Sequence, residues 1–287
     1  MAVEQYWAPA TLPAALEHLR SGDVTILAAG TDLMPQSHAG RVTLKRGLLN
    51  IRRVPELHVI ERDGDAVRIG ALCTIGELLH NPLVREYFGI LAEACDHFAS
   101  DQLRNAATIG GNVCNASPAG DTLVPLLVFD AEAELASKPD GRVETRHVPL
   151  VEFFVGPGKT VRAPNELLCA IRLPLPRAGF VGRFLKFGTR PALDISAIAI
   201  GVGGVRTGRT LTQTRVAFGA VAPVPMRAPR TEAALEGTVL DADAAGRIAA
   251  VARDEVRPID DVRASAWYRR ELVFNLTRRM LDDVAQA

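Results

Sequence analysis

Cysteine is scarce in this sequence, which holds four among 287 residues. Cys73, Cys95, Cys114 and Cys169 form no CxxC pair, and none has a histidine at zinc-finger spacing. The pattern indicates neither a disulfide framework nor a metal site. We expect four free thiols, buried or half-buried, in a reducing compartment, because a free cysteine usually behaves as a small apolar residue.

An excess of charge of one sign is also lacking, because 33 lysines and arginines balance 33 aspartates and glutamates. Such a chain has no net field to attract nucleic acid or an anionic membrane. No apolar run approaches the roughly 18 residues needed to span a bilayer. Residues 1–10 lack the apolar core of a signal peptide. We therefore expect a cytoplasmic protein with no nucleic-acid partner and no membrane span.

Motifs for side-chain catalysis are missing as well. The sequence has no HExxH, no serine, histidine and aspartate in a hydrolase order, and no motif of paired carboxylates. Its six histidines lie in dissimilar contexts. We predict no catalytic residue and no metal ligand, a pattern more typical of a protein that holds a cofactor.

The sequence contains enough apolar residues for a large interior: 48% of its residues are hydrophobic and 23% are charged. Its first part predicts a helix at 11–21, a strand at 24–29, two hairpins, two helices between 84 and 107, and a buried helix at 122–129. The segment 174–179, PLPRAG, interrupts regular structure. We place a domain boundary there, between residues 1–176 and 177–287. The second part has strand patterns followed by helical ones, which predicts an α+β domain with a small antiparallel sheet.

The segment TIGGN, from Thr108 to Asn112, is the least ordinary in the chain. Gly110 and Gly111 allow a ligand to approach the backbone, while Thr108 and Asn112 offer side-chain hydrogen bonds. Such a loop suits a pyrophosphate, and the small polar residues from Asn115 onward could hold a ribityl or ribose hydroxyl. The alternative is a structural glycine-rich turn.

A second small-residue loop, AAGTDL, follows the strand predicted at 24–29. Two such loops could converge on one diphosphate from two sides, although this one alone could equally be an ordinary turn from strand to helix.

Two other glycine-rich segments do not match the known nucleotide-binding motifs. Residues 156–160, GPGKT, lack the first glycine of a P-loop, and residues 201–204, GVGG, lack the helix-opening turn of the dinucleotide fingerprint.

Four segments in order, AAGTDLMP, TIGGNVCNASPAGD, GPGKT and KFGTR, together resemble the medium, FAD-binding subunits of the carbon monoxide and xanthine dehydrogenase family. The resemblance covers nearly the whole chain. It implies an α+β, PCMH-type FAD fold, shared with vanillyl-alcohol oxidase, whose two subdomains would span about 1–55 and 56–176. A C-terminal α+β domain would follow. No Cys-rich insertion for an extra cluster is present, so FAD is the one cofactor expected on this chain.

The resemblance also implies site residues. The first loop would give backbone N–H groups to the pyrophosphate, the second would bind its other side, Asp121 would be a polar anchor, and Lys186 would lie near the isoalloxazine. Phe98 and Leu168 would contact the cofactor, although either could equally be core. In the first loop Ala29 replaces a family glycine, which calls for an ordinary negative φ there. The full set is Ala29, Gly30, Thr31, Asp32, Leu33, Phe98, Thr108, Ile109, Gly110, Gly111, Asn112, Asn115, Asp121, Leu168 and Lys186.

The function implied is that of an electron-transfer subunit of a molybdenum hydroxylase. FAD would receive electrons from 2Fe-2S clusters on a small partner subunit, after a molybdopterin cofactor on a large partner has oxidised the substrate, and would pass them to an external acceptor. The assembly would be a dimer of heterotrimers. Two alternatives are a self-contained flavin oxidase of the same fold and a nucleotide-binding module without a redox role.

Overall fold

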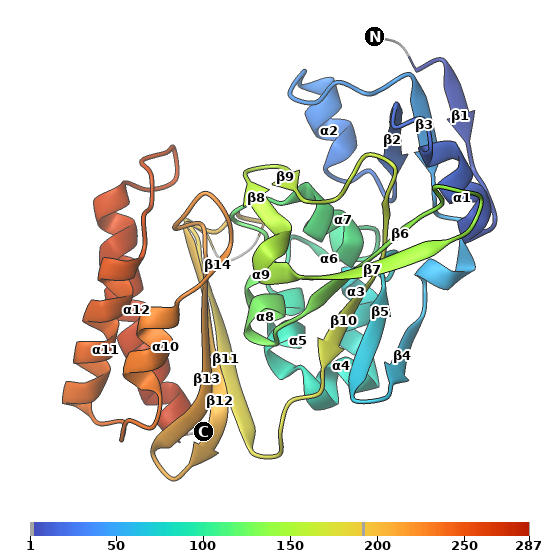
Figure 1. Cartoon of the computed structure of the whole chain (residues 1–287). Coiled ribbons are helices and arrows are strands. Elements are labelled where there is room, and N and C mark those ends of the chain that lie inside the picture. Colours follow the sequence, from blue (N-terminus) through green and yellow to red (C-terminus); the bar gives the residue numbers. More distant parts are fainter. Residues whose placement is uncertain (1–2, 191–192, 287) are drawn as a thin grey trace.

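The computed structural model describes residues 3–190 and 193–286, which form three sheets with helices packed on them and a short hairpin (Figure 1). The first sheet is parallel, with strand order β1 (Gln5–Trp7), β3 (Gly47–Asn50), β2 (Val24–Leu27). Helix α1 (Leu12–Leu19) connects β1 to β2, and α2 (Leu33–His38) follows β2. The helix predicted at 11–21 is confirmed: the Thr11 side chain caps it by accepting from Ala14 N.

The second sheet is antiparallel and five-stranded. Its strands, in spatial order, are β4 (Ile60–Asp63), β5 (Ala66–Gly70), β10 (Leu167–Pro174), β6 (Glu132–Ser137) and β7 (Glu144–Pro149). Both predicted hairpins are present, as β4 with β5 and β6 with β7. The smaller elements of this part are η1 (Pro55–Leu57), α9 (Leu150–Phe153), and the hairpin of β8 (Phe154–Gly156) and β9 (Lys159–Thr160).

Helices cover this sheet in a series that the sequence predicts only in part. They are α3 (Ile75–His80), α4 (Pro82–Tyr87), α5 (Gly89–Asp96), α6 (Asp101–Arg104), α7 (Ile109–Asn115) and α8 (Leu123–Val128). The expectation of two helices between 84 and 107 was wrong, because there are three. The first break is at Phe88, next to the predicted Gly89, and the second is near Ala99, whose φ is 42°.

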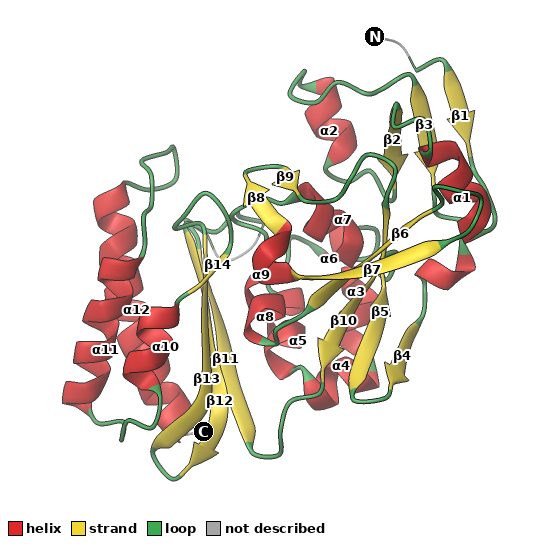
Figure 2. Cartoon of the chain, viewed as in Figure 1, coloured by secondary structure: helices red, strands yellow, loops and turns green. Residues whose placement is uncertain are grey.

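The C-terminal part has strands followed by helices, as predicted. A four-stranded antiparallel sheet, β11 (Phe180–Phe187), β12 (Ile198–Thr207), β13 (Thr210–Gly219) and β14 (Met226–Arg227), carries α10 (Pro229–Leu235), α11 (Ala242–Glu255) and α12 (Ala266–Gln286) on one face (Figure 2). The other face lies against α5 and α8 of the preceding part. The segment 201–204 is the middle of β12, so it forms no dinucleotide turn.

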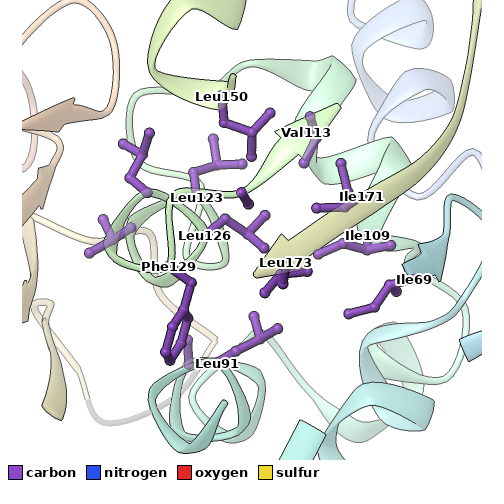
Figure 3. Close-up of a cluster of buried hydrophobic side chains, with 14 of the residues drawn as sticks. Ile69, Leu91, Ile109, Val113, Leu123, Leu126, Phe129, Leu150, Ile171 and Leu173 are labelled. Carbon is purple, nitrogen blue, oxygen red and sulfur yellow. The ribbon is translucent and has the colours of Figure 1, made fainter. Parts of the chain in front are cut away.

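Helix α8 is buried along its whole length between the two parts of the chain. On one side it contributes Leu123 and Leu126 to the largest core, where Phe129, just beyond its end, also lies (Figure 3). On the other side it contacts glycines of the C-terminal sheet. A Cβ at Gly201 would be 2.9 Å from Val124 Cγ1 and 2.9 Å from Val128 Cγ2. The glycines therefore allow a helix to lie directly on the backbone of the sheet.

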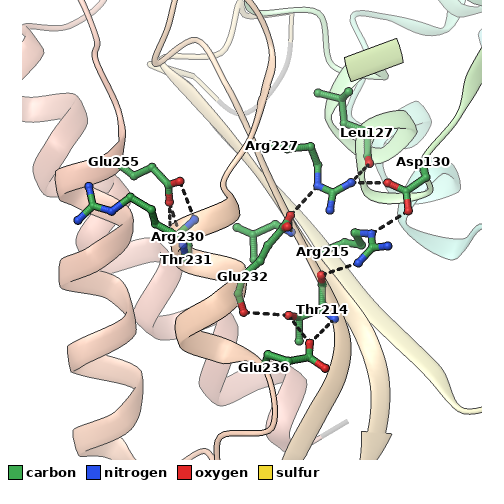
Figure 4. Close-up of polar contacts among 11 residues, drawn as sticks. Leu127, Asp130, Thr214, Arg215, Arg227, Arg230, Thr231, Glu232, Glu236 and Glu255 are labelled. Atoms are coloured by element: carbon green, nitrogen blue, oxygen red, sulfur yellow. Dashed lines mark hydrogen bonds and ion pairs between the residues drawn. The ribbon is translucent and has the colours of Figure 1, made fainter. Parts of the chain in front are cut away.

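Polar contacts at the end of α8 fix the same interface (Figure 4). Asp130 accepts from Arg215 Nε at 2.7 Å and also from Arg227, whose Nη1 donates to Leu127 O at 3.3 Å. Arg227 Nε in turn binds Glu232 on α10. These contacts connect α8, the C-terminal sheet and its helical layer, and the predicted α+β fold is confirmed.

Candidate functional site

The first candidate loop leads from β2 into α2, and its backbone donors have no partner among the described residues. Gly30 has a φ of 76°, and Ala29 is not among the residues with positive φ, in agreement with the ordinary geometry expected of an alanine. Within the described parts of the chain, the backbone N–H groups of Ala29, Gly30, Thr31, Asp32 and Leu33 form no hydrogen bond with protein. Their residues are exposed or half-buried. A run of successive amides of this kind is a site for an anion.

The second candidate loop differs in this respect, since the backbone N–H groups of its last four residues, 109–112, all donate to protein acceptors. Ile109 N donates to Cys73 O at 3.0 Å, Gly110 N to Ala71 O at 2.9 Å, and Gly111 N to Thr108 Oγ1 at 3.1 Å. Asn112 N donates to Thr108 O at 3.0 Å, as in a helix. The N-terminus of α7 therefore offers a ligand no free amide from these four residues.

The two glycines of this loop have different environments. A Cβ at Gly110 would lie 2.6 Å from Ala71 Cβ, so this glycine is explained by packing alone, as in the alternative of a structural turn. Gly111 is exposed, and a Cβ there would meet only the Thr108 hydroxyl. Asn112 Oδ1 accepts from Thr122 Oγ1 at 2.7 Å, which leaves the two N–H bonds of its amide without a protein partner in the described structure.

The loops are brought together by a contact between α2, which follows the first loop, and α7, which begins within the second. Gln36 Nε2, on α2, donates to Asn115 Oδ1, on α7, at 3.2 Å. Gly158, in the turn between β8 and β9, donates its N–H to Ala116 O at 3.1 Å. The GPGKT segment is thus a hairpin beside α7 with no helix after it, which excludes a P-loop.

Asp121 and Lys186 form a buried ion pair between the two parts of the chain. Lys186 Nζ, on β11, lies 2.7 Å from Asp121 Oδ2, and it also donates to His97 O at 3.2 Å. Ser196 Oγ donates to Asp121 Oδ1 at 2.8 Å. Burial raises the pKa of Asp121, and the Lys186 ammonium and the Ser196 hydroxyl act in the opposite direction. The two residues were predicted as separate cofactor contacts, and the structure brings them together.

The two apolar residues of the predicted site lie in different surroundings. Phe98, in the turn between α5 and α6, is half-buried and packs against the largest core. Leu168, on β10, is 2% exposed and belongs to that core, opposite Leu135. The core alternative therefore accounts for Leu168, while Phe98 is only partly buried.

Two further residues of this region were missed by reasoning from sequence. Gln36 lies in the second turn of α2 and Ser196 in the segment before β12, and no local motif marks either of them. Each makes its contact with a residue more than 70 positions away. Only the tertiary fold could identify them.

The residues present fit a dinucleotide. Five successive amides without a partner in the described structure can hold a pyrophosphate. The neighbouring face of β2 and α2 has half-buried apolar side chains, and the C-terminal sheet contributes a lysine, Lys186.

Groups of histidine, cysteine or carboxylate side chains that could hold a metal ion are not found among residues 3–190 and 193–286. Within the same ranges, no helix has the length and apolar character required to cross a membrane.

Comparison with known proteins gives a consistent result over the whole chain. Residues 2–176 match the model of the FAD binding domain in molybdopterin dehydrogenase, and residues 183–284 match that of the CO dehydrogenase flavoprotein C-terminal domain. The chain is 30% identical to the xanthine dehydrogenase FAD-binding subunit of Escherichia coli O157:H7, covering 98% of this chain and 96% of that protein. It is 32% identical to the glyceraldehyde dehydrogenase medium chain of Sulfolobus acidocaldarius, with 96% of each covered.

A solved structure of carbon monoxide dehydrogenase from Hydrogenophaga pseudoflava superposes with a TM-score of 0.92 at 30% identity. The match covers 99% of this chain and 97% of that one.

Proposed function

We propose that this chain carries electrons between the redox centres of partner subunits and an external acceptor. The proposal follows from its family, because the chain belongs to the FAD-binding subunits of the molybdopterin dehydrogenases. Bound FAD supplies the redox chemistry, and the protein binds and orients it. Electrons enter from 2Fe-2S clusters on a small subunit, after a molybdopterin centre on a large subunit has oxidised the substrate. They leave from the flavin to the external acceptor.

The observation that carries the cofactor assignment is the run of unpaired amides from Ala29 to Leu33. In the proposal these N–H groups hold the pyrophosphate, Gly111 and the Asn112 amide approach the dinucleotide from the other side, and the Gln36–Asn115 hydrogen bond keeps the two loops in register. Lys186 contacts the flavin ring from the C-terminal sheet. No side chain of this chain acts as a general acid or base.

The same proposal divides the chain into an FAD-binding part, residues 1–176, with subdomains of about 1–55 and 56–176, and a C-terminal domain, residues 177–287. It is supported by a separate sheet in each of the three regions. Each region also has an apolar cluster centred on it, although Leu72 and Leu167 join the first cluster and Phe184 and Ala199 join the second. The complex is a cytoplasmic dimer of heterotrimers. Four free cysteines are in keeping with a reducing compartment.

A pull-down of the tagged full chain from its native host tests this function. We expect three polypeptides in equal amounts, bound FAD, and the electron paramagnetic resonance signals of 2Fe-2S clusters and molybdenum. Addition of oxidised FAD to clusters reduced in advance should lead to flavin bleaching only when the full chain is present. A single chain that oxidises a substrate unaided would contradict the proposal and favour a self-contained flavin oxidase.

A further inference from the structure

Two aspartates flank α8, and each forms an ion pair with the C-terminal sheet. Asp121 precedes the helix and pairs with Lys186, whereas Asp130 follows it and pairs with Arg215 and Arg227. The surroundings differ, because the side chains of Asp121 and Lys186 are 10% and 9% exposed, while that of Asp130 is 48% exposed. Asp121 is next to Thr122, whose hydroxyl donates to Asn112 of the second candidate loop, whereas Asp130 is at the opposite end of α8.

The Lys186 ammonium has one donor left. An ammonium carries three N–H bonds, and Asp121 Oδ2 and His97 O account for two of them. Across the described residues no third protein acceptor is found for Nζ. A nearly buried charge with an unused donor is costly, so a ligand acceptor at this position would complete the site.

Both oxygens of the Asp121 carboxylate are already engaged with protein. Oδ2 accepts from Lys186 and Oδ1 from the buried Ser196 hydroxyl, which lies in the segment before β12. The carboxylate is thus fixed between two elements of the C-terminal domain. This arrangement suits a group that orients the lysine and partly neutralises it better than a group that binds a ligand itself.

From this geometry we infer that Asp121 and Ser196 are positioning residues that set the reduction potential of the flavin through Lys186. The inference rests on the proposed contact of Lys186 with the flavin. Reduction of FAD by two electrons and one proton leaves a negative charge on the ring, which a nearby cation stabilises. Lys186 then raises the potential, and Asp121 limits the increase by neutralising part of the charge.

The test measures the midpoint potential of FAD bound to the full chain, by dye-coupled titration with dithionite. We expect Lys186→Met to shift the potential to lower values and Asp121→Asn to shift it to higher values. Ser196→Ala, which frees the carboxylate, should shift it in the same direction as Asp121→Asn but by less. Lys186→Arg, which keeps the charge, should retain most of the wild-type potential. The double variant Asp121→Asn/Lys186→Met should lie between the two single variants.

Asp130→Asn is the matched control, because it removes an ion pair from the same interface but away from the cofactor. It should reduce thermal stability and leave the potential unchanged. Equal potentials in Asp130→Asn, Asp121→Asn and Lys186→Met, with FAD still bound, would overturn the inference and make the buried pair a structural contact only. If wild-type chain binds no FAD, the proposed cofactor function itself has failed, which is a separate result.

Discussion

Gln36 on α2 and Asn115 on α7, which are 79 positions apart in the chain, are joined by one hydrogen bond of 3.2 Å. This bond connects the helix after the first ligand loop with the helix that begins within the second, so it helps to fix the distance between the loops. It does so without either side chain needing to contact the cofactor.

Gln36→Ala should therefore weaken FAD binding about two- to tenfold, the effect of losing one hydrogen bond of roughly 0.5–1.5 kcal/mol. Fluorescence quenching of FAD on titration with the full chain measures the dissociation constant. In a double-mutant cycle with Asn115→Ala, the second substitution should add little to the first. Additive losses would mean that the two residues act independently.

Gly30→Ala should weaken FAD binding more than Gln36→Ala does, raising the dissociation constant about tenfold or more. Its φ of 76° is unfavourable for an alanine. The new Cβ would also lie 3.0 Å from Leu27 Cδ1 and from Met34 Cγ, so these side chains would have to shift beside the loop. Gly40→Ala is the matched control, with a φ of 69° and nothing within 4 Å of the new Cβ. Both variants should lose about 1 kcal/mol of stability, and only the first should lose cofactor.

Gly201→Val tests the packing of α8 against the sheet. The side chain would be forced against Val124 and Val128, and overpacking of this kind costs about 1–3 kcal/mol. Urea denaturation followed by circular dichroism should reveal a lower midpoint. Gly246→Ala, inside α11 and with open space around its new Cβ, should instead increase stability by roughly 0.8–1 kcal/mol. A Gly201→Val protein as stable as wild type would contradict the described interface.

The lowered pKa of Asp261 should make the stability of the protein depend on pH. Burial alone would raise its pKa, but hydrogen bonds from the buried Arg269 and from the backbone of Arg263 and Ala264 lower it to about 2, from 3.8. Because the folded-state pKa lies below the unfolded one, the stabilisation is complete above about pH 4 and is lost as the pH falls towards 2. Asp261→Asn should lower the melting temperature at pH 7, and its difference from wild type should shrink below pH 4. A constant difference would argue against this assignment.

Most of the fold could be predicted from sequence because its signals are local. Thr11 and the Thr74–Glu77 capping box mark helix starts, the hairpin turns contain glycine, and the strands and helices after residue 179 follow in separate groups. The break between α5 and α6 could not be predicted, since Ala99 adopts a positive φ that no residue type near it requires.

The candidate site could be predicted in position more than in chemistry. Both loops were identified by their small residues, and the second was expected to be the stronger. The structure reverses this order for backbone donors, since the amides of Ile109 and Gly110 bind the carbonyls of residues 73 and 71. Such a pairing depends on where two distant segments meet. The ion pair of Asp121 with Lys186 also depends on the tertiary fold. Both residues could be predicted from sequence as site residues, but their contact with each other could not.

Helix α8 lies in the first half of the chain, yet it completes the interior of both halves. During synthesis its apolar outer face has no cover until the strands beyond residue 197 have emerged, so the two halves cannot mature as independent modules. An engineered chimera that exchanges the C-terminal part at residue 177 would have to keep Gly201 and Gly203 of β12 and Gly219 of β13 matched to Val124 and Val128.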